Sequence, residues 1–321
     1  MQDSGTSIAE FFTNLVATLN GYVWSSALIY LCLGAGLFYS IMTRFVQVRL
    51  FREMIRLLFS SKESDKGISS FQALAVSLSG RVGTGNIAGV AAAIGFGGPG
   101  AVFWMWVVAF LGSATAYIES ALGQIYKEVD EGQYRGGPAY YIEKAMGQKW
   151  YAWIFAIVTI FACGVLLPGV QSNSIGNATN LAFGGEAMID FLGDPVPMTK
   201  LVTAIGVLAI LGFIIFGGVK RIAHVTQVIV PLMALGYILM AVGIIIYHIA
   251  ELPAILALIL SDAFTPMAGV GAAIGWGVKR GIYSNEAGQG SGPHAAAASE
   301  VQHPAQQGLV QAFSVYVDTL F

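Results

Sequence analysis

The sequence predicts an all-α membrane protein that crosses the bilayer several times. Of its 321 residues, 56% are hydrophobic and 11% are charged, whereas soluble domains carry about 25% charged residues. The apolar runs are about 20 residues long, which suits membrane-spanning helices and exceeds the roughly ten residues of a barrel strand. The net charge of −2 and the lack of a basic face argue against nucleic acid as a partner.

The N-terminal part of the chain combines a surface-active segment with a first span. Residues 6–20 are expected to form a short amphipathic helix, and residues 22–43 a first span. Residues 44–66 carry arginines spaced among apolar residues, which is typical of a helix lying on the membrane surface. Cys32 and Cys163 both lie inside apolar spans, so we interpret them as core residues and not as a disulfide or a metal pair.

The rest of the chain alternates apolar spans with polar loops. Further spans are expected at residues 70–95, 101–126, 150–177, 200–216, 225–248, 268–291 and from residue 306 onward. Twelve of the sixteen lysines and arginines lie in the loops 44–66, 127–149 and 220–221. By the positive-inside rule these loops face the cytoplasm, which places the N-terminus outside.

The span 70–95 contains a stretch, Gly80–Gly89, that suits a lipid-facing helix poorly. It holds four glycines together with Arg81, Thr84 and Asn86. A glycine costs about 1 kcal/mol relative to alanine in a helix interior, and a buried arginine costs at least about 2.5 kcal/mol on insertion scales. We interpret the stretch as a broken helix whose free amide and carbonyl groups form a binding site. Close helix packing through the glycines is the alternative, and it leaves the three polar residues unexplained.

A second copy of this motif occurs 199 residues further on. Arg280–Gly288 matches Arg81–Gly89 at four of nine positions. The two segments cross the membrane in opposite directions, as an inverted repeat requires. The sequence therefore predicts an N-terminal helix with a cytoplasmic amphipathic helix (1–69), a first five-helix repeat (70–248) and the start of a second repeat (249–321). Because the last residues form part of an apolar run, we expect the second repeat to be cut short and the chain to be a C-terminally truncated fragment.

These motifs carry a family resemblance. The segments Arg81–Val90 and Gly97–Trp106, together with Gly277–Gly281 and Ser284–Gly288, resemble the sodium:alanine symporter family, also described as alanine or glycine:cation symporters. The resemblance covers the whole chain. It implies a LeuT-type five-plus-five inverted-repeat fold with one extra N-terminal helix, in the plasma (inner) membrane of the cell. It also implies symport of alanine or glycine with Na⁺ as the coupling ion and no other cofactor.

The first broken helix offers groups that would bind a small neutral amino acid. The helix beginning near Asn86 directs its positive dipole end at the break, which suits a carboxylate. We expect the backbone N–H groups of Thr84, Gly85 and Asn86 to bind it. Carbonyl groups for the ammonium are expected halfway along the second broken span, at Ile274, Gly275, Trp276 and Gly277. Trp276 would also restrict the pocket to a small side chain, an ordinary lipid or helix contact being the alternative.

Two further sets of ligands follow from polar groups and from the resemblance. Gln171 can both donate and accept hydrogen bonds, and by resemblance it faces the substrate; the alternative is that it lies at the wet outer end of its helix. The LeuT-type pattern places one Na⁺ against the backbone carbonyls of Ser79 and Val82, and its remaining ligands would come from a helix beyond this chain. Asn86 is a candidate ligand for a second ion.

Four charged residues in the spans are candidates for a gate. Arg81, Glu119, Arg280 and Glu286 need partners if they are buried. The layout puts the two glutamates in the cytoplasmic half of the membrane. We expect an ion-pair network that closes an inner gate, the alternative being side chains that extend to the interface.

Three other functions are weighed against a Na⁺-coupled symporter. An H⁺-coupled carrier would need a titratable group at mid-depth, for which Asp318 is the candidate. A channel would also need polar residues at mid-depth, but broken-helix repeats favour a carrier. An intramembrane enzyme is not expected, because the spans contain no HExxH motif and no Ser-Lys or paired-Asp arrangement.

Overall fold

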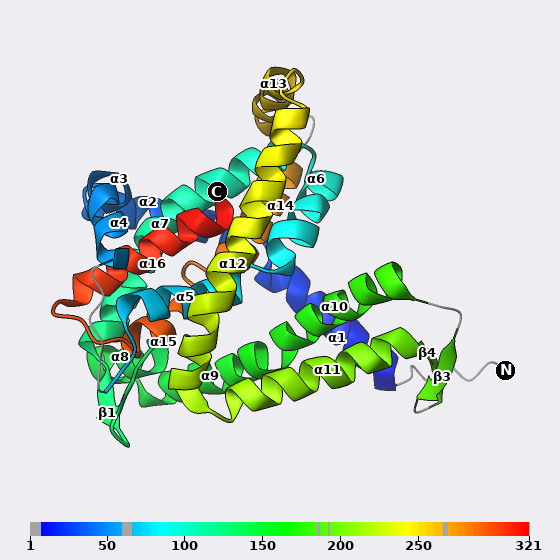
Figure 1. Ribbon diagram of the computed structural model, residues 1–321. Coiled ribbons are helices and arrows are strands. Elements are labelled where there is room, and N and C mark those ends of the chain that lie inside the picture. The colour runs from blue at the N-terminus through cyan, green and yellow to red at the C-terminus, as the bar shows by residue number, and fades with distance from the viewer. Residues whose placement is uncertain (1–7, 60–65, 185–186, 192, 266–268, 321) are drawn as a thin grey trace.

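The computed structural model describes residues 8–59, 66–184, 187–191, 193–265 and 269–320. Helices dominate this part of the chain (Figure 1), as predicted for an all-α polytopic membrane protein. The N-terminal helices are α1 (Ile8–Val23), α2 (Ser26–Met42), α3 (Val46–Arg49) and α4 (Phe51–Phe59). They are followed by α5 (Ser70–Arg81), the π-helical turn η1 (Gly85–Gly89), α6 (Val90–Gly97) and α7 (Gly100–Ile125).

The remaining elements include two short hairpins. The middle of the chain forms β1 (Glu128–Asp130), β2 (Gln133–Arg135), α8 (Pro138–Met146), α9 (Lys149–Phe161), the π-helical turn η2 (Ala162–Leu166), α10 (Leu167–Phe183), β3 (Met188–Phe191) and β4 (Asp194–Pro197). The last part forms α11 (Met198–Ile215), α12 (Gly218–Tyr247), α13 (Leu252–Ala263), α14 (Gly269–Asn285), α15 (Gly292–Ala297) and α16 (Pro304–Thr319).

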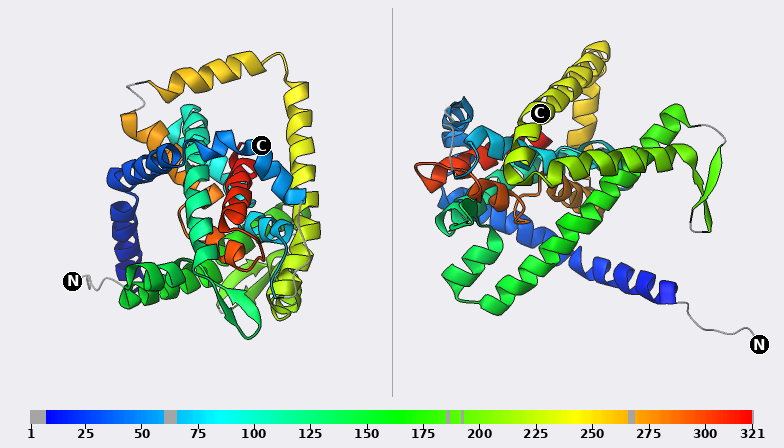
Figure 2. Two further views of the ribbon diagram at one scale, coloured as in Figure 1. Left: turned by 90° about the vertical axis from the view of Figure 1, so that its left-hand side faces the viewer. Right: turned by 60° about the horizontal axis from the view of Figure 1, so that its bottom comes forward.

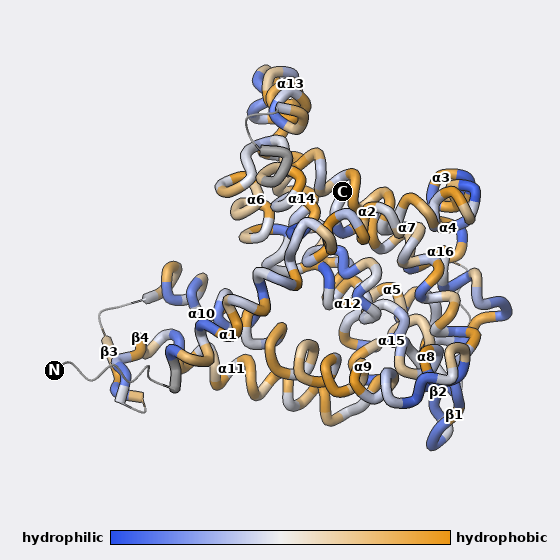
Figure 3. The backbone as a smooth tube through the Cα atoms, turned by 180° about the vertical axis from the view of Figure 1, so that it is seen from behind, coloured by the Kyte–Doolittle hydropathy of each residue, from blue (hydrophilic) through white to orange (hydrophobic). Residues whose placement is uncertain are grey.

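Four helices in the described residues are long and apolar enough to cross a membrane. They are α7, the continuous rod Lys149–Phe183, α11 and α12. Helices α1 and α2 would add a fifth if they form one span, although the chain bends by 41° between them. The rod and α11 extend away from the other helices toward the hairpin β3–β4 (Figures 1 and 2). Helices α9 and α11 consist largely of hydrophobic residues, whereas α10 also contains many hydrophilic ones (Figure 3). The composition of α9 and α11 suits contact with lipid.

The core of the protein surrounds α7, which packs against α16, α14, α15 and α2. Small residues allow these helices to approach closely. A Cβ atom at Gly308 of α16 would lie 2.7 Å from the Tyr117 carbonyl oxygen of α7. Beside this contact, Met54 and Leu57 of α4 pack with Leu309 of α16 in the largest apolar cluster. The arginines of α3 and α4 point away from this cluster into solvent, as predicted for a surface helix.

Helix α13 is held against the N-terminal end of α7. The backbone N–H of Gly100 donates to Asp262 Oδ2 at 2.7 Å, which satisfies one of the free amides of the first turn of α7. The indole of Trp104 donates to the Ala263 carbonyl at 3.1 Å. Both bonds fix the segment that precedes α14.

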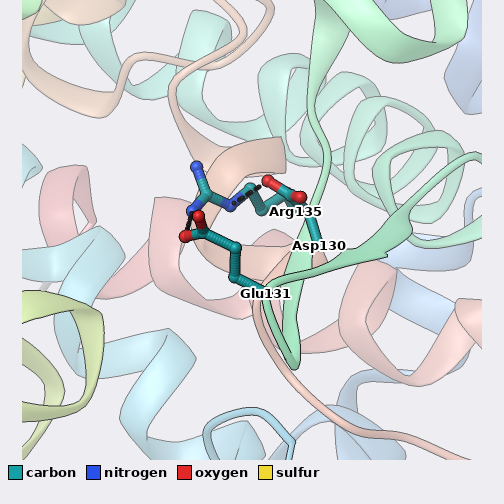
Figure 4. Close-up of polar contacts among 3 residues, drawn as sticks. All are labelled: Asp130, Glu131 and Arg135. Carbon is teal, nitrogen blue, oxygen red and sulfur yellow. Dashed lines mark hydrogen bonds and ion pairs between the residues drawn. The ribbon is translucent and has the colours of Figure 1, made fainter.

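The segment 127–149, predicted as a cytoplasmic loop, contains the hairpin β1–β2. Glu131 and Gly132 form its turn with φ of 49° and 75°. Arg135 forms ion pairs with Asp130 at 3.1 Å and with Glu131 at 3.2 Å (Figure 4). All three side chains are exposed, so these pairs add little stability.

Candidate functional site

The predicted break in the first interrupted helix is present at Val82–Thr84, between α5 and η1. Val82 has extended backbone, with ψ of 106°. In a continuous helix the N–H groups of Gly83 and Thr84 would bond to the carbonyls of Ser79 and Gly80. Instead, Gly83 N donates to Asn86 Oδ1 at 2.8 Å and Thr84 N donates to Gln171 Oε1 at 3.2 Å. The break therefore takes the Ser79 and Gly80 carbonyls out of helical hydrogen bonding.

The chain resumes as η1, a π-helical turn that continues into α6. Such turns are rare and occur frequently at functional sites. Gln171 of α10 reaches this region from outside the core. Its amide would lie 2.9 Å from a Cβ at Gly83, so only glycine fits there without displacing it. The structure thus brings together Thr84 and Gln171, two residues that the sequence predicted separately.

The second interruption lies later than expected. Helix α14 continues without a break through Ile274, Gly275, Trp276 and Gly277, the residues expected to offer free carbonyls. The chain leaves the helix only after Asn285, and Glu286, Gly288 and Gly290 have φ of 53°, 84° and 87°. The interruption expected at residues 274–277 is therefore wrong by about ten residues.

The glycines of α14 serve helix packing. A Cβ at Gly277 would lie 2.5 Å from the Ala101 carbonyl oxygen, which is too close for any larger residue. The Trp276 ring stacks on Phe96 with centroids 4.7 Å apart, and Ile274 packs beside Ile29 of α2. These four residues therefore contact α2, α6 and α7, and the structure does not bring them to the first break.

Ser284 is the residue of α14 that meets the first break. A Cβ at Gly85 would lie 3.2 Å from the Ser284 Cα. Ser284 is roughly 12 Å along the helix from Trp276, at 1.5 Å per residue. The internal repeat contained the signal for this contact, because its alignment pairs Gly85 with Ser284 and Asn86 with Asn285.

A cavity of about 260 Å³ lies at this meeting point. The break and η1 contribute Val82, Gly83 and Asn86, and α14 contributes Ser284. The remaining wall is mostly apolar and comes from α6, α7, α12 and α16, with Val90, Met105, Met233, Tyr237, Val317 and Asp318 among its residues. Its size and lining fit a small molecule bound by a few polar groups.

Asp318 brings a carboxylate to the cavity. Its side chain is buried, with 7% of its surface exposed. Asn86 Nδ2 donates to Asp318 Oδ1 at 2.9 Å and to the Asp318 carbonyl at 2.8 Å, and Thr319 Oγ1 donates to Oδ2 at 2.6 Å. In the described residues no cationic side chain forms an ion pair with it. From the sequence, Asp318 is expected only as the titratable group of an H⁺-coupled carrier and not as a ligand.

Three of the four predicted gate residues lie near one another, but as separate hydrogen-bonded groups. Arg81 is 2% exposed, and its Nη1 donates to Ser314 Oγ and to the Gln311 carbonyl of α16. Glu119 accepts from the N–H groups of Gly288 and Gly290 at 3.1 and 3.2 Å. Glu286 accepts from Ser291 Oγ at 2.5 Å. Among the described residues no ion pair joins the three, because backbone amides and hydroxyl groups already satisfy the carboxylates.

Arg280 is separate from these three residues. Its guanidinium carbon lies 5.3 Å from the centre of the Trp276 ring. The structure therefore does not bring Arg280 to the expected network.

Comparison with known proteins decides the family. Residues 9–321 match the model of the sodium:alanine symporter family. The chain belongs to this family. The predicted resemblance is thereby confirmed, over nearly the whole chain.

Three relatives illustrate the range of this symporter family. A putative sodium/proton-dependent alanine carrier protein, YrbD of Bacillus subtilis (strain 168), is 59% identical over 312 residues, which is 96% of this chain and 62% of the relative. A probable sodium/glutamine symporter, GlnT of the same organism, is 44% identical over 97% of this chain and 64% of its own length. The sodium/alanine symporter AgcS of Methanococcus maripaludis is 41% identical over 96% of this chain and 68% of its own length.

The chain spans a little over three fifths of the length of YrbD and GlnT. These relatives are named as carriers and symporters, not as enzymes. Together with its apolar helices, the family identifies the chain as a multi-pass membrane protein.

Proposed function

We propose that the protein is a secondary active transporter that carries a small neutral amino acid, alanine or glycine, into the cell together with Na⁺ by alternating access. The observation that supports this most directly is the break at Val82–Thr84, which exposes peptide groups beside a cavity of about 260 Å³. The names of the relatives add alanine, glutamine, sodium and protons as the cargo and ions of those proteins.

The cargo carboxylate is proposed to bind the N–H groups of Thr84, Gly85 and Asn86. In this structure Gln171 Oε1 already accepts from Thr84 N. A side-chain amide oxygen therefore occupies a position where a carboxylate oxygen would bind, next to the positive end of η1 and α6. A carboxylate would form shorter and stronger charge-assisted bonds to the same donors.

The coupling ion is proposed to bind at the other side of the break. Ser79 has lost its helical partner and Val82 lies in the break, so both backbone carbonyls are placed to ligate Na⁺. Unwound carbonyls of this kind coordinate ions in transporters without adding net charge. Asp318 supplies a carboxylate that would bind the cargo ammonium or a second cation in the cavity. Asn86 donates a hydrogen bond to this carboxylate.

Alternating access is proposed to depend on a LeuT-type inverted repeat. Helices α6 and α14 pack antiparallel, since Gly85 meets Ser284 whereas Gly97 meets Trp276. The two interruptions thus approach each other from segments of opposite direction, as such repeats require. We propose that Arg81, Glu119 and Glu286 close the cytoplasmic side, with partners on α16 and in the segment between α14 and α15. The plasma membrane with the N-terminus outside is the location we propose.

Uptake measurements test the proposal. Purified protein in proteoliposomes should accumulate radiolabelled alanine against its gradient when Na⁺ is higher outside, with saturable kinetics. Accumulation driven by a pH gradient alone, without Na⁺, would instead support an H⁺-coupled carrier; the buried Asp318 carboxylate is the observation that favours this second candidate. Unsaturable flux with ionic current and no uphill uptake would indicate a channel.

A further inference from the structure

Two cations on α14 have no part in the cavity described above. Lys279 and Arg280 lie beside Trp276, with Lys279 Nζ 5.8 Å and Arg280 Cζ 5.3 Å from the centre of its ring. Neither forms an ion pair with any residue in the described parts of the chain. A cation–π contact contributes about 0.5–2 kcal/mol, whereas a charged side chain in a membrane costs about 2.5–3.5 kcal/mol even on insertion scales. The pair therefore lacks a counter-charge.

A second cavity of about 310 Å³ adjoins these cations at the joint between α1 and α2. Its polar lining comes from the side chains of Asn20, Trp24, Trp276, Lys279, Arg280 and Tyr283. The ammonium, guanidinium and indole groups can only donate hydrogen bonds, and no carboxylate is among the described residues that line the cavity. This chemistry selects an anion that has several acceptor oxygens.

The depth of the cavity fits the level of lipid headgroups. Trp276 packs directly on Gly97, beside the Gly98–Pro99 turn that joins α6 to α7 and marks one membrane end of both helices. Lys279 and Arg280 follow Trp276 by at most about 6 Å along α14. Their long side chains span that distance, as lysine and arginine do when they extend to an interface.

Helix α1 supports the same depth. It bends by 41° from α2 at the edge of the cavity, and it exposes large apolar side chains, including Phe11, Phe12 and Leu19. Such a surface suits contact with the membrane, and Trp24, which follows α1, is a residue type enriched at the membrane interface.

We propose that this second cavity binds the phosphodiester headgroup of an anionic phospholipid, with phosphate oxygens on Lys279 and Arg280. Arginine binds phosphate through two parallel hydrogen bonds, and the indole of Trp24 and the hydroxyl of Tyr283 line the same space. A volume of about 310 Å³ holds a headgroup while the acyl chains stay in the bilayer. The bound lipid joins the N-terminal helix pair to α14, which carries one wall of the proposed transport site.

Native mass spectrometry of the purified protein in detergent tests this inference. The protein is delipidated and titrated with dioleoyl-phosphatidylglycerol. One lipid per chain should bind with a dissociation constant at least tenfold lower than that of the Lys279→Gln/Arg280→Gln variant. The Lys144→Gln/Lys149→Gln variant, which removes two positive charges from the segment 138–149, should bind like the wild type. Equal lipid binding by the wild type and the Lys279→Gln/Arg280→Gln variant overturns the proposal.

Two further measurements distinguish lipid binding from a folding defect and from the binding of a free anion. The Lys279→Arg variant keeps the charge and should retain the lipid, whereas loss of binding in this variant argues against recognition by charge. Inorganic phosphate at the same concentration should leave the thermal unfolding midpoint of the wild type unchanged, while phosphatidylglycerol raises it. An equal rise with inorganic phosphate would overturn the lipid assignment in favour of a free anion.

Discussion

Helices α7 and α11 are both apolar and long enough to span a membrane, yet the structure uses them in opposite ways. In the most apolar 18-residue window of α7, 44% of residues are buried, and in that of α11 none is. Helix α7 contains Gly112, Ser113 and Glu119 at buried positions, whereas α11 has no buried residue and half of its 18 residues are leucine, isoleucine or valine. Hydropathy identifies both spans, but polar residues among the small ones distinguish the helix that packs on protein from the helix that suits lipid.

The largest effect should come from adding a methyl group to a glycine that packs on α7, with a glycine of α11 as the control. Gly308→Ala places a Cβ 2.7 Å from the Tyr117 carbonyl oxygen of α7 and should destabilise the fold by about 1–3 kcal/mol through overpacking. Gly206→Ala on α11 meets nothing within 4 Å and should gain up to about 1 kcal/mol from helix propensity. Denaturant unfolding in detergent measures both, and equal effects would mean that the two helices are packed alike.

A pair of aspartates compares the cavity at the first break with the hairpin β3–β4. Asp318→Asn removes a buried charge that Asn86 and Thr319 stabilise. Hydrogen bonds to charged groups contribute about 1.5–3 kcal/mol, so Na⁺-driven alanine uptake should fall at least about tenfold. Asp190→Asn alters an exposed turn, where the carboxylate accepts only from Gly193 N, and should keep full uptake. Unchanged uptake by Asp318→Asn would remove this carboxylate from the proposed mechanism.

Helix α10 allows the same comparison of packed and exposed positions within one helix, because only part of α10 contacts the first break. Gln171→Ala removes the acceptor that the cargo carboxylate has to displace from Thr84 N and, at about 1 kcal/mol for a neutral hydrogen bond, should lower the KM for alanine about fivefold. Asn177, on the same helix, is exposed, and Asn177→Ala should leave KM unchanged. Initial uptake rates over a range of alanine concentrations distinguish the two variants.

The smallest effect concerns Lys127, which follows the C-terminal end of α7. Partial burial lowers the pKa of Lys127 from 10.5 to about 8, against an opposing effect of Glu300. Its ammonium donates to the Ser299 carbonyl at 2.7 Å and lies 3.9 Å from the centre of the Tyr134 ring. Between about pH 8 and 10.5 the unfolded chain binds more protons at this residue than the folded one, so folding stability should rise with pH in this window.

The Lys127→Met variant should lose this dependence. The control is Lys149→Met, because Lys149 is exposed and has only a loose ion pair with Glu143 at 3.8 Å. Thermal unfolding midpoints measured from pH 7 to pH 10 provide the test. A slope that is the same in all three proteins would assign the pH dependence to other groups.

The sequence predicted four of the spans and the first break because both depend on local composition. Four glycines with Arg81, Thr84 and Asn86 within ten residues suit a lipid-facing helix poorly whatever surrounds them. The second break was misplaced because glycines at mid-span look the same whether they unwind a helix or let it pack. Gly277 proves to be a packing residue only through its contact with Ala101, which is distant in sequence.

Asp318 illustrates the same limit for the site. Its role beside Asn86 depends on α16 packing against the first break, a contact between residues 232 positions apart. No local pattern around Asp318 indicates that contact. The internal repeat, which compares distant segments, was the one sequence signal that paired Gly85 with Ser284 correctly.

The side chains of Asn86 and Gln171 have a kinetic consequence. Because Gln171 satisfies the Thr84 amide and Asn86 the neighbouring Gly83 amide in this structure, an amino acid that binds Thr84 on the proposed route replaces an existing hydrogen bond. The net free energy of binding is then small, and so is the barrier to release once the opposite side opens. In the proposed carrier, this exchange favours rapid turnover over tight binding.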